Sequence, residues 1–275
     1  MKIGTLIRPK NVDDLDRVFT NLRENDIDAC QLVYKPAVYT QEDAQKIREK
    51  AEEYGVEISA QFLGFRDPFV SWDTHYGHVT SGIANPTYRA LRMQDLFDGM
   101  QFVSWLGLKD FIVHAGYIPN NPFDPEYGAF VAAVRQLCAR AKTLGLNFLF
   151  ETGQESPVTL LRVIKESAAD NLFINLDTGN LILYGYGNPV DAMYTFGSYV
   201  RGVHAKDALP PTDPYHHGKE VAVGSGFVDF EKVMKMLKEN GYDGHLTIER
   251  EISGPQQTAD ILSAKKYLTE VWNRV

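Results

Sequence analysis

The sequence has little that is typical of secreted, membrane-spanning or nucleic-acid-binding proteins. Its two cysteines, Cys30 and Cys138, belong to no CxxC or Cys/His motif, so we expect reduced core residues. The longest apolar run, Ala129 to Val134, has six residues, whereas a membrane helix needs about 20. The 28 Lys and Arg residues against 36 Asp and Glu give a net charge of −8, which predicts no broad positive surface for a phosphate backbone. These absences favour a small-molecule partner, without nucleic acid or membrane.

We expect neither a targeting segment nor a linker in this sequence. The first residues, Met1 to Ile7, have too short an apolar stretch for a signal peptide and indicate a first strand, so we expect a cytoplasmic protein. No linker rich in proline, glycine or serine and no low-complexity tract divides the 275 residues. A hydrophobic content of 44% fits a folded chain with a sizeable core. Residues 1–275 are therefore expected to form one domain.

Short β-branched or aromatic runs alternate with amphipathic stretches, which is the pattern of a parallel α/β fold. Eight candidate strands are Lys2–Ile7, Asp28–Tyr34, Glu57–Leu63, Asp110–His114, Asn147–Glu151, Leu172–Asp177, Tyr199–His204 and Gly244–Glu249. Candidate helices are Asp13–Asn25, Gln41–Tyr54, Tyr88–Leu106, Tyr127–Leu144, Pro157–Ala168, Asp229–Asn240 and Ala259–Val271. Glycines at 55, 107, 145 and 241 follow four of these helices, as C-terminal caps do. The repeat predicts a single (β/α)8 barrel.

Two connections in this repeat are unusually long. They run from Gly64 to about Thr87, after the third strand, and from Ala205 to about Val228, after the seventh. Both follow strand ends, and in a barrel such connections form the face that carries catalysis. We expect these insertions after strands 3 and 7 to form walls or a lid over a pocket, although exposed loops without function remain the alternative.

Polar side chains stand at the ends of five consecutive strands: His114, Glu151, Asp177, His204 and Glu249. Each alone has a structural explanation, such as a helix cap for Asp177 or a core histidine for His204. Together they would converge on one mouth of the barrel, where buried charges must be paired, solvated or bound to metal. Two Glu, one Asp and one His form an oxygen-rich set that suits Mn²⁺, Mg²⁺ or Co²⁺ better than a structural zinc.

This arrangement resembles the sugar phosphate isomerase/epimerase superfamily of xylose-isomerase-like TIM barrels. Ketose 3-epimerases, hydroxypyruvate isomerase and inosose-processing enzymes belong to it. The resemblance is carried by the order Glu, Asp, His, Glu on strands five to eight, by His-Ala-Gly on strand four, and by the segment Val-Gly-Ser-Gly-Phe-Val-Asp-Phe from residue 223. It covers essentially the whole chain and implies a TIM barrel with a divalent-metal site.

The resemblance implies that one divalent ion is held by Glu151, Asp177, His204 and Glu249. Mn²⁺ is the expected ion, with Mg²⁺, Co²⁺ or Zn²⁺ as alternatives. It also implies that Glu151 and Glu249 act as acid and base. Two carboxylates on opposite faces of a substrate can remove and return a proton next to a carbonyl while the cation stabilises the enediolate. The expected activity is isomerisation or epimerisation of a small ketose, keto-polyol or sugar phosphate, by an enzyme of carbohydrate metabolism.

The candidate substrate-binding residues are His114, Glu155, Asn180, Lys206 and Trp72. Asn180 stands where sugar 3-epimerases tend to have His, and Lys206 begins a segment where they tend to have Asn-Asp-Arg. Lys206 is suited to bind a substrate oxygen or phosphate, with an ion pair near Asp207 as the alternative. Gly224-Ser225-Gly226 resembles a phosphate cradle.

Three other functions remain open at this point. The first is a metal-dependent lyase or dehydratase acting on a keto-sugar or inosose, for which the site would look the same. The others are an endonuclease IV-like nuclease, which the acidic charge disfavours, and a non-catalytic sugar-binding subunit. Exposed aromatic residues in the insertions, together with the habit of related barrels, favour a homo-oligomer, either a dimer or a tetramer.

Overall fold

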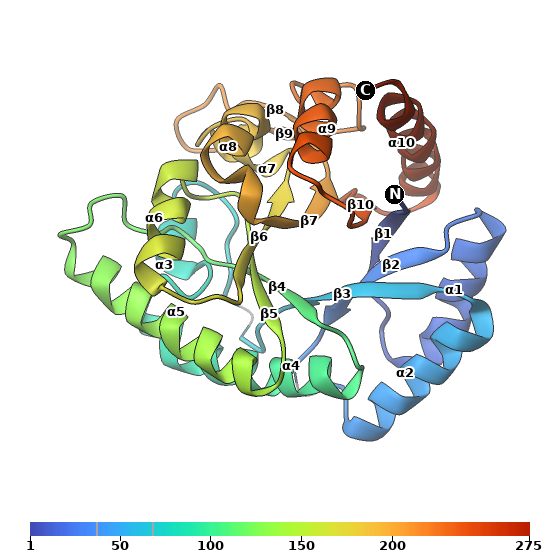
Figure 1. Ribbon diagram of the computed structural model, residues 1–275, viewed down its shortest axis with the longest axis horizontal. Helices are drawn as coiled ribbons and strands as arrows, with labels where there is room; N and C mark the ends of the chain where they lie inside the picture. The colour runs from blue at the N-terminus through green and yellow to red at the C-terminus, as the bar shows by residue number, and fades with distance from the viewer. Residues whose placement is uncertain (37, 68) are drawn as a thin grey trace.

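The computed structural model describes residues 1–36, 38–67 and 69–275. Parallel strands form a closed barrel with helices around it, as the sequence predicts (Figure 1). Around the barrel the strand order is β1, β10, β7, β6, β5, β4, β3, β2. The strands are β1 (Ile3–Ile7), β2 (Ala29–Tyr34), β3 (Glu57–Leu63), β4 (Asp110–His114), β5 (Asn147–Glu151), β6 (Leu172–Asp177), β7 (Val200–Ala205) and β10 (Leu246–Ile248). The first and last strands pair in parallel and close the barrel.

The long helices follow the sequence pattern to within a few residues. They are α1 (Leu15–Glu24), α2 (Gln41–Tyr54), α4 (Pro86–Trp105), α5 (Pro125–Thr143), α6 (Pro157–Ser167), α9 (Phe230–Glu239) and α10 (Pro255–Arg274). Side chains cap the N-termini of five of these helices, all except α1 and α10, for example Thr40 in a capping box at α2 and Asp124 at α5. All four predicted glycines lie just past a helix end with a positive φ, between 62° and 75°.

The structure also contains elements that the sequence pattern does not predict. A 3-10 helix, η1 (Val12–Asp14), precedes α1, and α3 (Gly77–Thr80) lies within the first insertion. Between β6 and β7 lie α7 (Asn180–Tyr184), α8 (Pro189–Phe196) and η2 (Gly197–Tyr199). The second insertion contains an antiparallel pair, β8 (Asp207–Leu209) and β9 (Lys219–Val221). The βα connections therefore carry structure of their own beside the barrel mouth.

Most apolar side chains pack between the strands and the helices, and a smaller apolar cluster fills the barrel interior. The interior cluster consists of Ala60, Ile112 and Leu149. Side chains alternate between the two faces of a strand, so the residue two positions after Ile112 and the residue two positions after Leu149 also face the interior. These residues are His114 and Glu151. The interior cluster thus fills the barrel directly below the polar residues at the strand ends.

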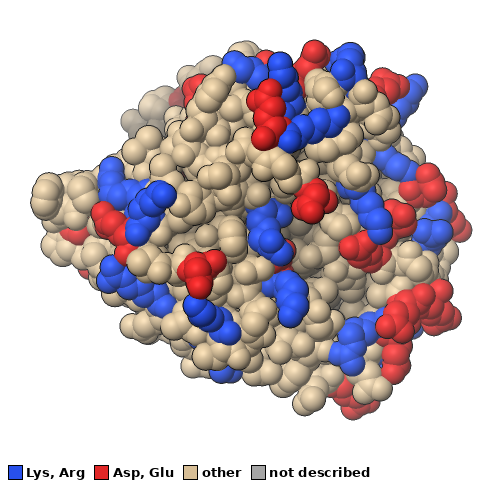
Figure 2. Space-filling view, viewed as in Figure 1, with Lys and Arg blue, Asp and Glu red and all other residues tan. Residues whose placement is uncertain are grey.

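The surface carries charges of both signs. On the face shown in Figure 2, Lys and Arg are interspersed with Asp and Glu and do not gather into a single positive area. Among the described residues, none of the helices combines the length and the apolar character that crossing a membrane requires.

Candidate metal centre and active site

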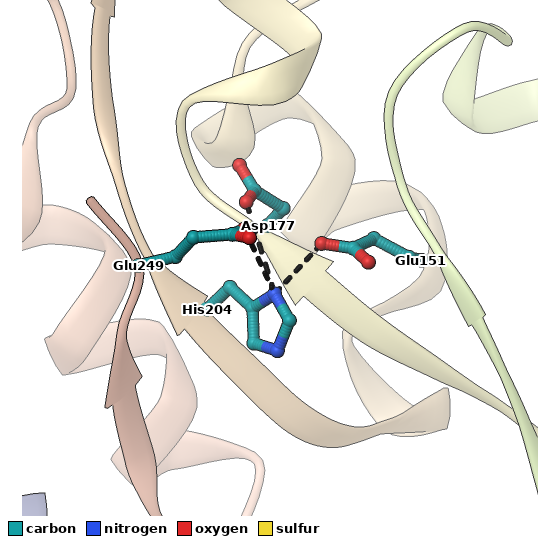
Figure 3. Close-up of side chains that lie close together, drawn as sticks. All are labelled: Glu151, Asp177, His204 and Glu249. Atoms are coloured by element: carbon teal, nitrogen blue, oxygen red, sulfur yellow. Dashed lines mark hydrogen bonds and ion pairs between the residues drawn. The ribbon is translucent and has the colours of Figure 1, made fainter. Parts of the chain in front are cut away.

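Four polar side chains meet at the carboxyl ends of adjacent strands. Glu151 ends β5, Asp177 ends β6, His204 lies in β7, and Glu249 directly follows β10. Asp177 and His204 are register partners in the parallel sheet, which places their side chains at one level. One ligand atom from each of the four residues lies within 4.8 Å of the others, and all four side chains are buried. Figure 3 shows Glu151 and Glu249 reaching His204 from opposite sides.

The His204 ring has two different environments. Its Nδ1 lies 2.7 Å from Glu151 Oε1, 3.3 Å from Glu249 Oε2 and 4.0 Å from Asp177 Oδ2. Its Nε2 lies 2.6 Å from the side-chain oxygen of Gln31, on β2. Nδ1 is therefore the ring atom directed at the carboxylates, and Nε2 points away from them.

Burial and charge act on the pKa values of this cluster in opposite directions. Burial alone would lower the pKa of His204, but the carboxylates of Glu151 and Glu249 outweigh it and raise the pKa to about 10. Burial, together with the neighbouring Glu151 and Glu249, raises the pKa of Asp177 well above its ordinary value despite the opposing Lys206 and His204. The cluster thus holds more negative charge than its own histidine neutralises.

Glu249 has the opposite environment. Burial would raise the pKa of its carboxyl, but Lys206, His204 and Arg8 together hold the pKa well below its ordinary value. The Arg8 Nη2 atom lies 3.0 Å from Glu249 Oε1, and the Lys206 Nζ atom lies 3.6 Å from Oε2. Glu249 is therefore an ionised carboxylate.

These residues fit a divalent cation. Glu151 Oε2 and Asp177 Oδ2 are buried and have no hydrogen-bond partner among the described residues. Buried polar atoms are normally satisfied, so two orphaned carboxylate oxygens in one buried cluster indicate a missing positive partner. Three carboxylates and one imidazole form a hard, oxygen-rich donor set of the kind that Mn²⁺ and Mg²⁺ accept.

A cavity of about 930 Å³ opens beside the cluster. Four of the five candidate substrate-binding residues line it: Trp72, His114, Asn180 and Lys206. Trp72 packs on His114 with 4.8 Å between ring centroids, and His114 Nε2 lies 3.6 Å from Glu151 Oε2. Glu249 also lines the cavity, so one metal-site glutamate is directly accessible from it.

Lys206 and Glu155 are both buried, and each has polar partners within the chain. Lys206 is 2% exposed, and its Nζ atom contacts Glu251 at 2.6 Å as well as Glu249, with no contact to the Asp207 side chain. The neighbouring carboxylates outweigh burial and raise the pKa of Lys206 well above its ordinary value. Glu155 is buried and is not among the cavity-lining residues, and its Oε1 accepts a hydrogen bond from the Gly153 amide at 3.3 Å. Burial raises the pKa of Glu155 to about 8.

Both insertions contribute to the cavity wall. Trp72 comes from the first insertion, and Lys206, His217 and Glu220 come from the second. The first insertion is held at both of its ends by the fully buried Arg92 of α4. Its guanidinium donates to the Asp67 carboxylate at 3.0 Å and to the Gly82 carbonyl at 2.6 Å. The first insertion therefore forms part of the cavity wall and is anchored at both of its ends.

The glycine-rich segment is not a free phosphate cradle. The amides of Gly224 and Gly226 donate to Asp207 Oδ2 at 2.9 and 2.8 Å, and the amides of Ala208 and Val228 donate to Oδ1. A buried carboxylate from the same chain thus occupies the position that an anion would take. The sequence-based interpretation is wrong here because the second insertion folds back on its own first strand, β8, which begins with Asp207.

Arg8, Gln31 and Glu251 are site residues that the sequence analysis did not identify. Arg8 directly follows β1, so it is one more polar residue at a strand end. Gln31 is a polar residue inside the otherwise apolar strand Ala-Cys-Gln-Leu-Val-Tyr. Both signals are visible in the sequence, but the partners Glu249 and His204 are more than 170 positions away, and only the closed barrel brings them together.

Comparison with known proteins places this geometry in a family. A xylose isomerase domain protein from Planctomyces limnophilus is 32% identical, with a TM-score of 0.88 over 99% of this chain and 97% of that one. A structure of L-ribulose 3-epimerase, at 18% identity, has a TM-score of 0.75 over 100% and 95% of the two chains and is similar in fold.

Among curated sequences, an inosose dehydratase from Lacticaseibacillus casei is 25% identical over 170 residues, which are 54% of this chain and 56% of that protein. The match to this relative thus spans about half of each chain. The family model described as xylose isomerase-like TIM barrel matches residues 19–270. The chain belongs to the xylose isomerase-like TIM barrel family.

Proposed function

We propose that this protein is a divalent-metal-dependent enzyme that transfers a proton at a carbon next to the carbonyl of a small polyhydroxy ketone, and so isomerises or epimerises it. The observation that carries the proposal is the placement of Glu151 and Glu249 on opposite sides of one buried cluster, with the cavity beside them (Figure 3). One glutamate, as the carboxylate, takes the proton from one face of the carbon, and the other, as the carboxylic acid, gives a proton to the opposite face, which inverts the carbon.

The two glutamates have different roles in this proposal. Glu249 is ionised and lines the cavity, so it is the base that accepts the proton from the substrate carbon. Glu151 is the group that supplies a proton on the other side, and His114 lies 3.6 Å from its Oε2 at the cavity wall. A divalent ion held by Glu151, Asp177, His204 and Glu249 would polarise the carbonyl and offset the negative charge that develops as the proton leaves.

The cavity wall supplies the groups that would orient a sugar. Lys206 offers a charged donor, and Asn180 offers an amide beside it on the wall. The aromatic ring of Trp72 is 40% exposed and supplies an apolar surface for a sugar face. These groups recognise hydroxyl and carbonyl oxygens, in keeping with the ketose epimerase whose fold is similar.

Deuterium exchange tests the reaction. Chelator-treated enzyme reloaded with Mn²⁺ or Mg²⁺ is incubated in D₂O with free ketoses, a keto-inositol and their phosphates, and products are examined by NMR and mass spectrometry. We expect deuterium at one carbon-bound position. Glu249→Gln and Glu151→Gln should each slow its entry by about 100-fold or more.

The matched control is Glu57→Gln, which makes the same change at the opposite end of the barrel, where Glu57 begins β3 and pairs with Lys2. It should leave exchange unchanged. Absence of exchange with every substrate in the panel would contradict the proposal.

Dehydration is the second candidate function, favoured by Lys206 together with the inosose dehydratase relative. Glu249 would again take the proton next to the carbonyl, and the electron pair of that bond would form a carbon–carbon double bond as a β-hydroxyl leaves. Lys206, which is protonated and lines the cavity, would give that hydroxyl a proton so that it leaves as water. A product lighter by one water, with enone absorbance, would establish this reaction in place of epimerisation.

A further inference from the structure

Gln31 occupies an unusual position for a polar side chain. It lies within β2 between Cys30 and Leu32, is 3% exposed, and faces the barrel interior beneath the metal cluster. Its Oε1 atom lies 2.6 Å from His204 Nε2, on the side of the ring away from the three carboxylates. Burying an amide in a strand that is otherwise apolar costs free energy, so this contact is the feature of the site that accounts for a glutamine there.

The chemistry of the contact is directional. An amide oxygen only accepts hydrogen bonds, so the 2.6 Å contact requires a hydrogen on His204 Nε2. In a neutral imidazole the other ring nitrogen then carries the lone pair. That nitrogen is Nδ1, which faces Glu151, Asp177 and Glu249. For the neutral ring, the acceptor on β2 thus selects the tautomer whose Nδ1 lone pair is available to a cation held among the carboxylates.

The geometry points to Gln31 as a positioning residue: we propose that it holds the His204 ring in the Nε2–H tautomer with Nδ1 aimed at the cluster, and so sets the affinity of the site for a divalent cation. The inference rests on the proposed function only through the metal site. It needs no substrate and no turnover. Loss of the hydrogen-bond acceptor behind a metal-ligating histidine typically lowers metal affinity by about 10- to 100-fold.

The variants follow from the surroundings of Gln31. A cavity of about 280 Å³ at the amino end of the barrel reaches this side chain, so a shortened residue would let water take the place of the amide oxygen. Gln31→Leu is therefore the informative change, because leucine fills a similar volume and has no acceptor. Gln31→Glu keeps the acceptor.

Gln61 on β3 offers a matched control. It is also a fully buried glutamine, and neither polar atom of its amide has a hydrogen-bond partner among the described residues. It lies between Ala60 and Phe62, which belong to the interior cluster, so alternation directs it to the other face of the sheet. Gln61→Leu removes the same groups without touching His204.

The experiment measures Mn²⁺ binding to the chelator-treated protein by calorimetry, with thermal unfolding to verify the fold of each variant. We expect Gln31→Leu to weaken binding about 10- to 100-fold, Gln31→Glu to stay within a few-fold of the parent protein or bind more tightly, and Gln61→Leu to leave binding unchanged. Nitrogen-15 spectra of the Mg²⁺-loaded protein should show His204 as the Nε2–H tautomer, and Gln31→Leu should change that signal.

Two outcomes would overturn the inference without affecting the metal site itself. One is a Gln31→Leu protein that binds Mn²⁺ as tightly as the parent, and the other is an equal loss in Gln31→Leu and Gln61→Leu. A parent protein that binds neither Mn²⁺ nor Mg²⁺ would overturn both the inference and the proposed function.

Discussion

Lys206 and Glu249 form an ion pair at the boundary between the large cavity and the metal-binding cluster, with 3.6 Å between Nζ and Oε2. Each member helps to keep the other ionised although both side chains are almost completely buried. The pair therefore places a fixed positive charge beside a ligand of the proposed cation.

Removing that charge should tighten metal binding. In Lys206→Met the repulsion between the ammonium and a divalent cation disappears. Even at the dielectric constant of bulk water, a single and a double positive charge about 6 Å apart repel by roughly 1.4 kcal/mol, so we expect at least about tenfold higher affinity. Calorimetric titration with Mn²⁺ measures the change. Lys206→Arg retains the charge and should behave like the parent, whereas a Lys206→Met protein with weaker binding would show that the lysine supports the ligands instead of opposing the cation.

A divalent ion should stabilise the fold. Without it the cluster keeps two orphaned carboxylate oxygens in a buried position. An ion at about 100 times its dissociation constant adds about 2.7 kcal/mol to the free energy of unfolding, which should raise Tm by roughly 5 °C. Calorimetry with Mn²⁺ or Mg²⁺, compared with NaCl at equal ionic strength, tests this. Asp177→Asn should lose most of the rise, and a rise that this variant retains in full would mean that the ion binds elsewhere.

Glu155 should make stability depend on pH. Its folded pKa is about 8, mainly because of burial, against an ordinary value of 4.5. A carboxyl with a raised folded pKa favours the folded state when protonated, so its contribution is intact below pH 4.5 and is lost as pH rises to about 8. Glu155→Gln cannot ionise.

The unfolding free energy of Glu155→Gln should therefore match that of the parent protein near pH 4.5 and exceed it by a few kcal/mol at pH 8 and above. Urea unfolding of metal-free protein across this range measures the difference. A difference that stays constant with pH would mean that Glu155 does not change its protonation on unfolding.

Asp207 should be important for the stability of the second insertion. Its carboxylate accepts hydrogen bonds from four backbone amides, two of them in the Gly224–Gly226 segment. In Asp207→Asn one acceptor becomes a donor that faces other donors, and we expect a loss of about 3 kcal/mol in unfolding free energy. Ser225→Ala, an exposed change in the same segment, should be neutral in urea unfolding. Equal stability of the two variants would show that the amides find water instead.

The barrel was largely predictable from the sequence because its signals are local. Strand-like segments of five to seven residues and capping glycines recur along the chain, and both ends of every predicted strand lie within two residues of the observed ones. The positions of Glu151, Asp177 and His204 at strand ends followed directly from that register. Their meeting in space is a consequence of closure, which brings consecutive strand ends together.

The parts that were not predicted depend on contacts between distant residues. β8 and β9 have three residues each, which is too short for a recognisable alternation of apolar and polar residues. Each is a strand only because it pairs with the other. The glycine-rich segment has the composition of an anion cradle, and only its contact with Asp207 shows that the amides are already occupied. In the sequence, Gln31 is only a polar residue in an apolar strand, and its contact with His204 is visible only in the structure.

The buried Arg92 holds the first insertion, which forms part of the cavity wall, at two points. The Arg92 guanidinium binds the Asp67 carboxylate and the Gly82 carbonyl, and thus holds both ends of the first insertion, which contains Trp72. The stretch Phe69–Ser81 lies between these two fixed points, so we expect substitutions at its exposed positions to alter the cavity wall without moving the strands of the barrel. If the proposed function holds, libraries directed at this stretch should change substrate specificity at little cost to the fold.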